Sequence, residues 1–419
     1  MRTITLIQNY WHKLLTNPLL VGSVIMFVGA NVHNAGQLLY HYLAINLLSR
    51  AHYGDLAAMI AIFSYLGIVQ QSLGLSVVKF IASEKDEKES HGHSKAIFFW
   101  SIWVAGAMAL IILTLAPLIS KFLQIGQPGA VYLFAPVVFI TFVTNTGRSL
   151  LQGVVRFFQL ATSMIVEVLV KIISTIVLVK LGYELFGAVI GLLIGAAVGL
   201  GVVWLSLKDN LKGARKTMLS IVPLLKYSLP VMVQSIAMTA MYSTDIILVK
   251  HFFQPDIAGS YAALSKFGTI ALFVSSPIAT VMFPLVAKKH SHGEPYHKVF
   301  YLSLASITII SSVVVIIYKL FGSLIADTLT KGKYVEESYL LWWFGLYMLL
   351  LGVAVLFTQF YLSIGQTKTV WLFAIAAILQ VVLIWFFHSE LVSIIQSSVV
   401  SAALLVLCLS IYFLYHDHK

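Results

Sequence analysis

The sequence predicts an all-α polytopic membrane protein, with about twelve transmembrane helices in two six-helix lobes. Apolar segments long enough to cross a bilayer recur along all 419 residues, and the mean hydropathy is +0.93. Only 10% of the residues are charged, whereas soluble proteins contain about 25%. A stretch of the second half also repeats the pattern of the first half, which predicts two lobes that are built alike.

Hydropathy places six spans in each half of the chain. The predicted spans are 19–48, 55–82, 96–120, 130–153, 157–181, 184–207, 224–252, 258–287, 299–319, 339–364, 369–388 and 391–415. The longest loops expected between them are 83–95 and 208–222 on the inner side and 321–338 on the outer side. The domain prediction is an N-lobe over 1–207, a basic cytoplasmic linker over 208–222 and a C-lobe over 223–419.

The internal repeat aligns residues 52–83 with residues 257–288 without a gap. In this alignment Gly54 falls on Gly259 and Ala57 falls on Ala262. An even number of spans in each half makes the repeat parallel, so a pseudo-two-fold axis should run along the membrane normal. Repeats of this kind are typical of secondary transporters with one central site.

The net charge of +11 is explained by membrane topology rather than by nucleic-acid binding. With the N-terminus inside, 17 of the 27 Lys and Arg residues lie in or beside inner segments, and seven lie in or beside outer segments. This bias predicts that both termini are cytoplasmic. Because Cys408 is the only cysteine, no internal disulfide can form and a zinc site is not expected.

Span six carries four glycines at four-residue spacing: Gly187, Gly191, Gly195 and Gly199. Such a stripe lies on one helix face and allows close packing against a neighbour. We interpret it as a packing seam; the alternative is a face that lines the substrate path.

Polar groups within the predicted spans give the candidate site, since ionisable residues in hydrocarbon are costly. Span one is the most polar and predicts a hydrated cavity wall, with interhelical hydrogen bonding as the alternative. Its polar residues are Asn31, His33, Asn34, Gln37 and His41.

Span five carries Glu167 and Lys171 at i, i+4 spacing near the membrane midplane. They are either a structural ion pair or part of a substrate or ion site. Asp245 and Lys266 are expected to pair in the outer third of the membrane, and Lys79 can extend toward the inner surface.

Sequence motifs give no sign of a resident cofactor or metal. We find no phosphate-binding glycine loop and no nucleophile elbow, and the His91-Gly-His93 and His290-Ser-His292 pairs lack acidic or thiol partners at metal-site spacing. The only driving force that the sequence suggests is proton or sodium coupling, with Glu167 and Asp245 as candidates.

Residues 47–67 and 242–288 resemble the oligosaccharide flippases of the multidrug/oligosaccharidyl-lipid/polysaccharide exporter superfamily, a polysaccharide biosynthesis protein family. The shared features are Asp245 near the end of span seven, Gly259 with Tyr261 in the turn that follows, and Phe283 with Pro284 at the end of span eight. The lipid II flippases of this superfamily differ, because they have fourteen spans and an arginine-rich cavity. Here Arg148 and Arg156 are expected only beside an inner turn.

The resemblance implies a multi-pass protein of the inner (plasma) membrane that is not an enzyme. It implies that an undecaprenyl-pyrophosphate-linked oligosaccharide moves from the inner to the outer leaflet by alternating access. The partners implied are the lipid-linked glycan, membrane lipids, and the polymerase and glycosyltransferases of the same pathway, with no nucleic acid. The cations expected to face the pyrophosphate are His33, His41, Lys79, Lys171 and Lys266.

Two other functions remain open on the sequence. One is a cation-coupled multidrug exporter of the same superfamily, in which Glu167 and Asp245 would bind the ion. The other is a membrane glycosyltransferase or glycan polymerase, for which the outer segments offer Asp327, Glu336 and Glu337 but no obvious catalytic scaffold.

Overall fold

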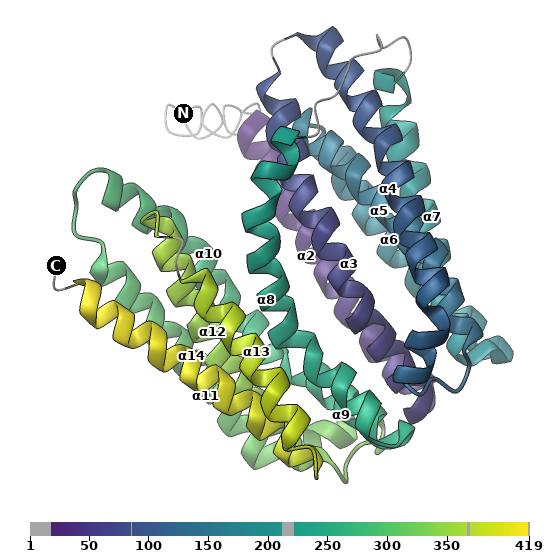
Figure 1. The fold of residues 1–419 in the computed structure, drawn as a ribbon, viewed down its shortest axis with the longest axis vertical. Coiled ribbons are helices and arrows are strands. Elements are labelled where there is room, and N and C mark those ends of the chain that lie inside the picture. The colour runs from purple at the N-terminus through teal and green to yellow at the C-terminus, as the bar shows by residue number, and fades with distance from the viewer. Residues whose placement is uncertain (1–17, 85, 212–221, 367–368, 418–419) are drawn as a thin grey trace, which may run out of the picture. The chain divides into compact units, whose positions relative to one another are not determined.

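The computed structural model describes residues 18–84, 86–211, 222–366 and 369–417, and the described chain is almost entirely helical (Figure 1). It forms two compact units. Unit 1 comprises Met1–Leu47, Leu66–Lys121 and Gln127–Pro230, and unit 2 comprises Leu48–Tyr65, Phe122–Gly126 and Val231–Lys419. The lobe boundaries predicted from the sequence stay a prediction, and most of the predicted linker lies outside the described residues.

Helices α2 to α7 follow one another in the first half of the chain. They are α2 (Pro18–Leu47), α3 (Arg50–Ser83), α4 (Glu87–Phe122), α5 (Gly129–Gly153), α6 (Phe157–Leu178) and α7 (Glu184–Leu211). The core of unit 1 forms where α3, α4, α5 and α7 bury Val77, Phe98, Leu150 and Val203 together.

The described part of the second half continues with seven α-helices. They are α8 (Val222–Phe252), α9 (Pro255–Gly268), α10 (Ile270–Ser291), α11 (His297–Thr330), α12 (Leu341–Ser363), α13 (Val370–Phe386) and α14 (Leu391–Asp417). Aromatic rings form one part of the unit 2 core. The ring of Phe300 stacks on that of Phe413 with centroids 4.9 Å apart, and its centroid lies 4.4 Å from that of Phe360.

Eight helical runs among the described residues are long and apolar enough to cross a membrane. One of them, Phe157–Leu211, has 55 residues and contains a short π-helical turn, η1 (Val179–Tyr183). Gly182 in this turn has φ +91°, a conformation that glycine adopts without strain. The turn therefore reverses the chain and separates α6 from α7.

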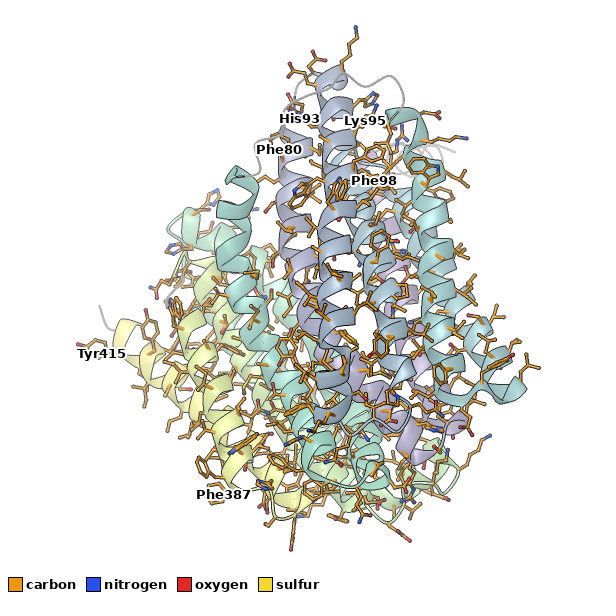
Figure 2. All side chains as sticks on the ribbon, turned by 45° about the vertical axis from the view of Figure 1, so that its right-hand side comes forward. Phe80, His93, Lys95, Phe98, Phe387 and Tyr415 are labelled. Carbon is orange, nitrogen blue, oxygen red and sulfur yellow. The ribbon has the colours of Figure 1, made fainter. Side chains whose placement is uncertain are left out.

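Two segments that were expected to be loops are partly helical. The loop predicted at 83–95 is wrong over most of its length, because α4 begins at Glu87. Phe80 at the end of α3 packs edge-on against His93 of α4, with ring centroids 4.9 Å apart (Figure 2). The loop predicted at 321–338 is also shorter, since α11 continues to Thr330 after an irregular residue at Phe321. Hydropathy finds where a chain becomes polar, but a helix can continue past that point.

The internal repeat has a structural counterpart. Helix α3 begins at Arg50 and α9 begins at Pro255, the same offset as in the sequence alignment. The matched glycines touch within unit 2: a Cβ on Gly54 would lie 2.9 Å from the backbone nitrogen of Gly259, and a Cβ on Gly259 would overlap the carbonyl oxygen of Arg50. The two helix starts therefore cross at a point where neither can carry a side chain. The second copy differs from α3 in being interrupted at Thr269.

Candidate functional site

A buried lysine lies at the centre of the candidate site in unit 1. Lys171 on α6 is only 4% exposed. Its ammonium donates a hydrogen bond to Gln37 Oε1 on α2, and it lies 4.4 Å from the ring centroid of Tyr40. Gln37 and Tyr40 are neutral, so their dipole and ring electrons stabilise the ammonium without cancelling its charge. Lys171 forms no direct ion pair with Glu167, which was one of the two alternatives for span five.

Glu167 is paired instead with Arg148, a residue of α5. Arg148 Nη2 lies 2.6 Å from Glu167 Oε2 and also donates to the carbonyl oxygen of Ser163 at 2.9 Å. The remaining donors of the guanidinium reach Ser163 Oγ at 2.9 Å and Asn145 Oδ1 at 3.1 Å. The side chains of Arg148 and Glu167 are only 10% and 14% exposed. Arg148 lies near the end of α5, close to the α5–α6 turn as expected, but its guanidinium is buried between α5 and α6.

The glycine stripe of α7 explains which way these side chains point. Its glycines face α6 in antiparallel register: Gly187 meets Leu178, Gly191 meets Thr175, Gly195 meets Lys171 and Gly199 meets Glu167. A Cβ on Gly195 would lie 2.6 Å from Cβ of Lys171. The interpretation as a packing seam is confirmed. Because α7 closes this face of α6, the Lys171 ammonium is directed toward α2.

A short hydrogen-bonded chain continues from Lys171 along α2. Gln37 Nε2 lies 3.1 Å from His33 Nε2, and His33 Nδ1 lies 3.1 Å from the carbonyl oxygen of Met164. A carbonyl can only accept, so this arrangement assigns the proton to Nδ1 and leaves Nε2 to accept from Gln37. Both ring nitrogens of a neutral His33 therefore have a hydrogen-bond partner in this chain.

The remaining polar residues predicted for span one and span two lie outside this hydrogen-bonded chain. Asn31 is exposed and donates to the carbonyl of Phe27 in its own helix at 2.7 Å. Asn34 and Lys79 are exposed, and His41 is half-buried with its ring edge against Tyr40. The structure thus brings together Gln37, His33 and Lys171 but not the whole predicted set.

In unit 2, Asp245 on α8 is 1% exposed and accepts a hydrogen bond from the Tyr261 hydroxyl at 2.8 Å. The backbone N–H of Ile246 donates to its other oxygen at 2.9 Å. These contacts replace the ion pair expected with Lys266, which is half-buried near the end of α9.

Unit 2 contains a buried ion pair that sequence reasoning missed. Lys250 Nζ on α8 lies 2.7 Å from Asp55 Oδ1 on α3, and the two side chains are 1% and 3% exposed. Both residues were placed at predicted span ends, where a charge is unremarkable. The one available signal was the position of Asp55 directly after the repeated Gly54.

The comparisons with known proteins agree with this architecture. The sequence profile described as polysaccharide biosynthesis protein matches residues 20–290, which is more than half of the chain. The chain belongs to the polysaccharide biosynthesis protein family. No curated protein matches the sequence.

Solved structures of MOP superfamily transporters resemble this polysaccharide biosynthesis protein in fold. An inward-facing multidrug resistance MATE family transporter has a TM-score of 0.79 at 13% identity, covering 92% of this chain and 96% of its own. The lipid II flippase MurJ in an inward closed conformation has a TM-score of 0.75 at 15% identity, covering 96% and 88%.

A third similar structure is a MOP superfamily transporter from Pyrococcus furiosus, with a TM-score of 0.55 at 18% identity, covering 93% and 94%. Its description states that a reversed polarity of the binding pocket suggests a different function for that protein. At these identities the likeness establishes the shared fold of the polysaccharide biosynthesis protein and leaves its substrate to be argued from its own residues.

Proposed function

We propose that this protein moves a polyprenyl-pyrophosphate-linked oligosaccharide from the inner to the outer leaflet by alternating access. The observation that carries the proposal is the charge state of the buried site in unit 1. Among the described residues, the direct partners of the Lys171 ammonium are the neutral side chains of Gln37 and Tyr40. The nearby carboxylate of Glu167 acts on Lys171 only from a distance and is bound directly by Arg148. Two cations and one carboxylate therefore leave the site with a net positive charge of one.

A buried cation without an anionic partner is costly, and an arriving anion removes much of that cost. The pyrophosphate of a lipid-linked glycan offers such an anion, while its polyprenyl chain can stay in the bilayer. Binding would require the ammonium to exchange Gln37 Oε1 for a phosphate oxygen, a stronger charge-assisted bond. The family membership supports a glycan-pathway substrate, with the pathway's polymerase and glycosyltransferases as partners.

The proposed setting is a bacterial or archaeal inner membrane with both termini cytoplasmic. We propose twelve crossings in two lobes, 1–207 and 223–419. The helix order, the chain reversal at Gly182 and the matched starts of α3 and α9 support this count. The asymmetric distribution of Lys and Arg supports the orientation.

The test is leaflet translocation in proteoliposomes, with a polyprenyl-pyrophosphate oligosaccharide that is labelled on its sugar and an impermeant reagent outside. Lys171→Gln is expected to slow protein-dependent translocation about tenfold or more, because losing a charge-assisted contact of ~1.5 kcal/mol or more corresponds to a factor of ten. Lys171→Arg, which keeps the charge, should retain more activity.

The matched control is Lys180→Gln, which removes the same charge from an exposed lysine just beyond α6. It should translocate like the unmodified protein. Each variant is first shown to be monodisperse, with an unchanged melting temperature. Translocation by folded Lys171→Gln at the normal rate would contradict the assignment of the site.

A cation-coupled multidrug exporter is the second candidate, favoured by the similarity in fold to the MATE transporter. In either case we propose Asp245 as the coupling residue, because a neutral hydroxyl and a backbone N–H hold its buried carboxylate. The same liposomes test this with imposed proton and sodium gradients. Loss of gradient dependence in Asp245→Asn supports coupling; transport that ignores every gradient before and after the change excludes it.

A further inference from the structure

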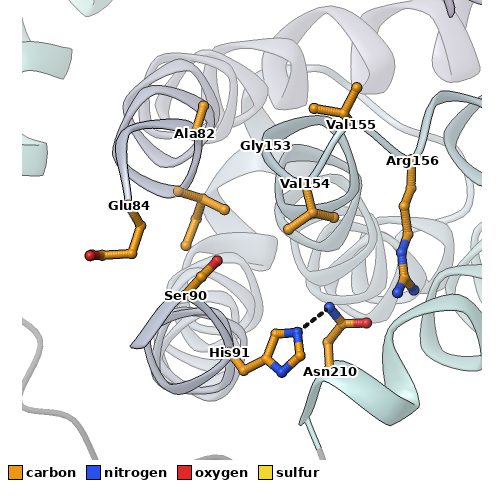
Figure 3. Close-up of a pocket in the computed structure, with 10 residues that line it drawn as sticks. Ala82, Glu84, Ser90, His91, Gly153, Val154, Val155, Arg156 and Asn210 are labelled. Carbon is orange, nitrogen blue, oxygen red and sulfur yellow. Dashed lines mark hydrogen bonds between the residues drawn. The ribbon is translucent and has the colours of Figure 1, made fainter. Parts of the chain in front are cut away.

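A polar pocket of about 340 Å³ lies at one end of unit 1, and it is lined by residues that do not belong to the Lys171 site (Figure 3). It forms where α3 ends, α4 begins, α5 turns into α6 and α7 ends. The polar side chains that line it are Glu84, Ser90, His91, Arg156 and Asn210. The transport site described above uses none of these residues.

Arg156 gives this pocket its positive charge. It is half-buried and lies in the turn between α5 and α6, after Val155, whose φ of +61° turns the chain sharply. Nη1 donates to the carbonyl oxygen of Ser206 at 2.7 Å, and no carboxylate among the described residues pairs with the guanidinium. Helix α6 begins at the next residue, so its positive end adds to the local potential.

Asn210 gives the pocket an unsatisfied polar atom. The side chain is 4% exposed, and its Nδ2 lies 2.9 Å from His91 Nε2. Its Oδ1 is buried and has no hydrogen-bond partner within the described parts of the chain. Figure 3 shows Asn210 lined up between His91 and Arg156 along one side of the pocket. A buried acceptor of this kind needs a donor from a ligand or from water.

Glu84 is the one acidic residue among those that line the pocket. It lies on the opposite side from Arg156 in Figure 3, and its Oε2 is 3.2 Å from His93 Nδ1. Its carboxylate therefore faces α4 rather than the Arg156 side. On the side with Arg156, His91 and Asn210, the guanidinium of Arg156 can bind an anion, and Asn210 Oδ1 is a nearby hydrogen-bond acceptor.

We infer that this pocket binds a phosphate ester that carries a neighbouring hydroxyl group, with the phosphate on Arg156 and the hydroxyl donating to Asn210. The guanidinium presents several N–H donors in a fixed plane that fits phosphate oxygens. His91 orients Asn210 through the hydrogen bond that they share. Glycerol phosphate has this combination of groups, either as a lipid headgroup or as a free molecule.

The experiment measures binding to the full-length protein in detergent by its melting temperature. The probes are dihexanoyl-phosphatidylglycerol, sn-glycerol 3-phosphate and, as a phosphate-free control, dihexanoylglycerol. Arg156→Gln should weaken phosphate-dependent stabilisation at least tenfold in half-saturating concentration, and Arg156→Lys should weaken it less. Asn210→Leu fills the same space without a polar atom and should also weaken it.

The matched control is Lys208→Gln, which removes a charge from an exposed lysine on the same helix as Asn210 without lining the pocket. It should change the half-saturating concentration less than twofold. Stabilisation by the lipid alone identifies a headgroup site, and stabilisation by both phosphates identifies a site for the free ester. Equal stabilisation by dihexanoylglycerol, no stabilisation by any probe, or equal weakening in Lys208→Gln and Arg156→Gln would overturn the inference.

Discussion

Arg148 and Glu167 form the most completely bonded charged pair in unit 1. The guanidinium reaches Glu167, Ser163 and Asn145, so most of its donors are used. Taking two charges out of water costs several kcal/mol each, and such a pair is stable only when both partners are present. The pair therefore acts as a neutral unit, and this neutrality is what leaves the charge of Lys171 uncompensated.

We expect Arg148→Met and Glu167→Met each to lower the free energy of unfolding by about 3 kcal/mol, since each leaves one buried charge alone. The double variant should lose much less than the sum of the two. Melting temperatures and denaturant midpoints of the four proteins in one detergent provide the measurement. Additive losses would show that the two side chains are not coupled.

At the scale of single residues, the sequence identified the buried charged side chains but not the side chains with which they pair. Lys171 and Glu167 stand out in any hydropathy scan as charges in an apolar span. Their spacing suggested that they pair with each other, but i, i+4 neighbours compete with groups on other helices. Arg148 on α5 pairs with Glu167 and also hydrogen-bonds other groups around it, which Lys171 does not. Sequence spacing cannot reveal this contact, because the two residues lie on different helices.

The seam between α6 and α7 is the element that positions the candidate site. Four glycines on α7 let the two backbones approach along α6 from Leu178 to Glu167. In a membrane the close contact of small residues contributes to helix association through packing, because lipid provides no hydrophobic drive. A side chain at any of these positions would push α6 toward α2.

Gly195→Leu should lower the melting temperature, since overpacking a tight contact costs about 1–3 kcal/mol. It should also impair translocation more than its loss of stability explains, because Lys171 lies directly against Gly195. Gly201→Leu on the same helix is the control, as nothing lies within 4 Å of the added Cβ. A Gly195→Leu protein as stable and active as Gly201→Leu would show that the seam is loose.

Helices were more predictable than their ends. A long apolar run has few alternatives to a membrane helix, so the predicted spans fall within the observed helices in most cases. The four-residue glycine spacing likewise needs no tertiary information. The extensions at Glu87–Lys95 and Phe321–Thr330 were missed because hydropathy marks where a span leaves the membrane, whereas a helix can continue through polar residues beyond that point.

At the scale of the whole molecule, the charge asymmetry predicts which ends of the helices face the cytoplasm. We expect cysteines placed at Glu89 and Ser291, in a Cys408→Ser background, to be protected from an impermeant thiol reagent in intact cells. A cysteine at Lys331 should react, because it lies in the turn that ends α11 on the opposite predicted side.

Permeabilised cells provide the control, since all three positions are exposed and should then react equally. Labelling of Glu89→Cys and Ser291→Cys in intact cells would reverse the orientation. Labelling of only one of the two would contradict the parallel repeat, because Glu89 lies shortly after α3 and Ser291 ends α10, the corresponding helix of the second half.

The contact between Gly54 and Gly259 bears on how such a chain could have arisen. If the two halves descend from one ancestral gene whose product paired with itself, this glycine once faced its own copy. A single mutation in that gene would have added a side chain to both helices at their crossing point. Duplication and fusion separate the two positions, so each can now mutate alone. Each position nevertheless stays restricted to glycine, because an added Cβ on Gly54 would meet the backbone of Gly259 and one on Gly259 would meet the carbonyl of Arg50.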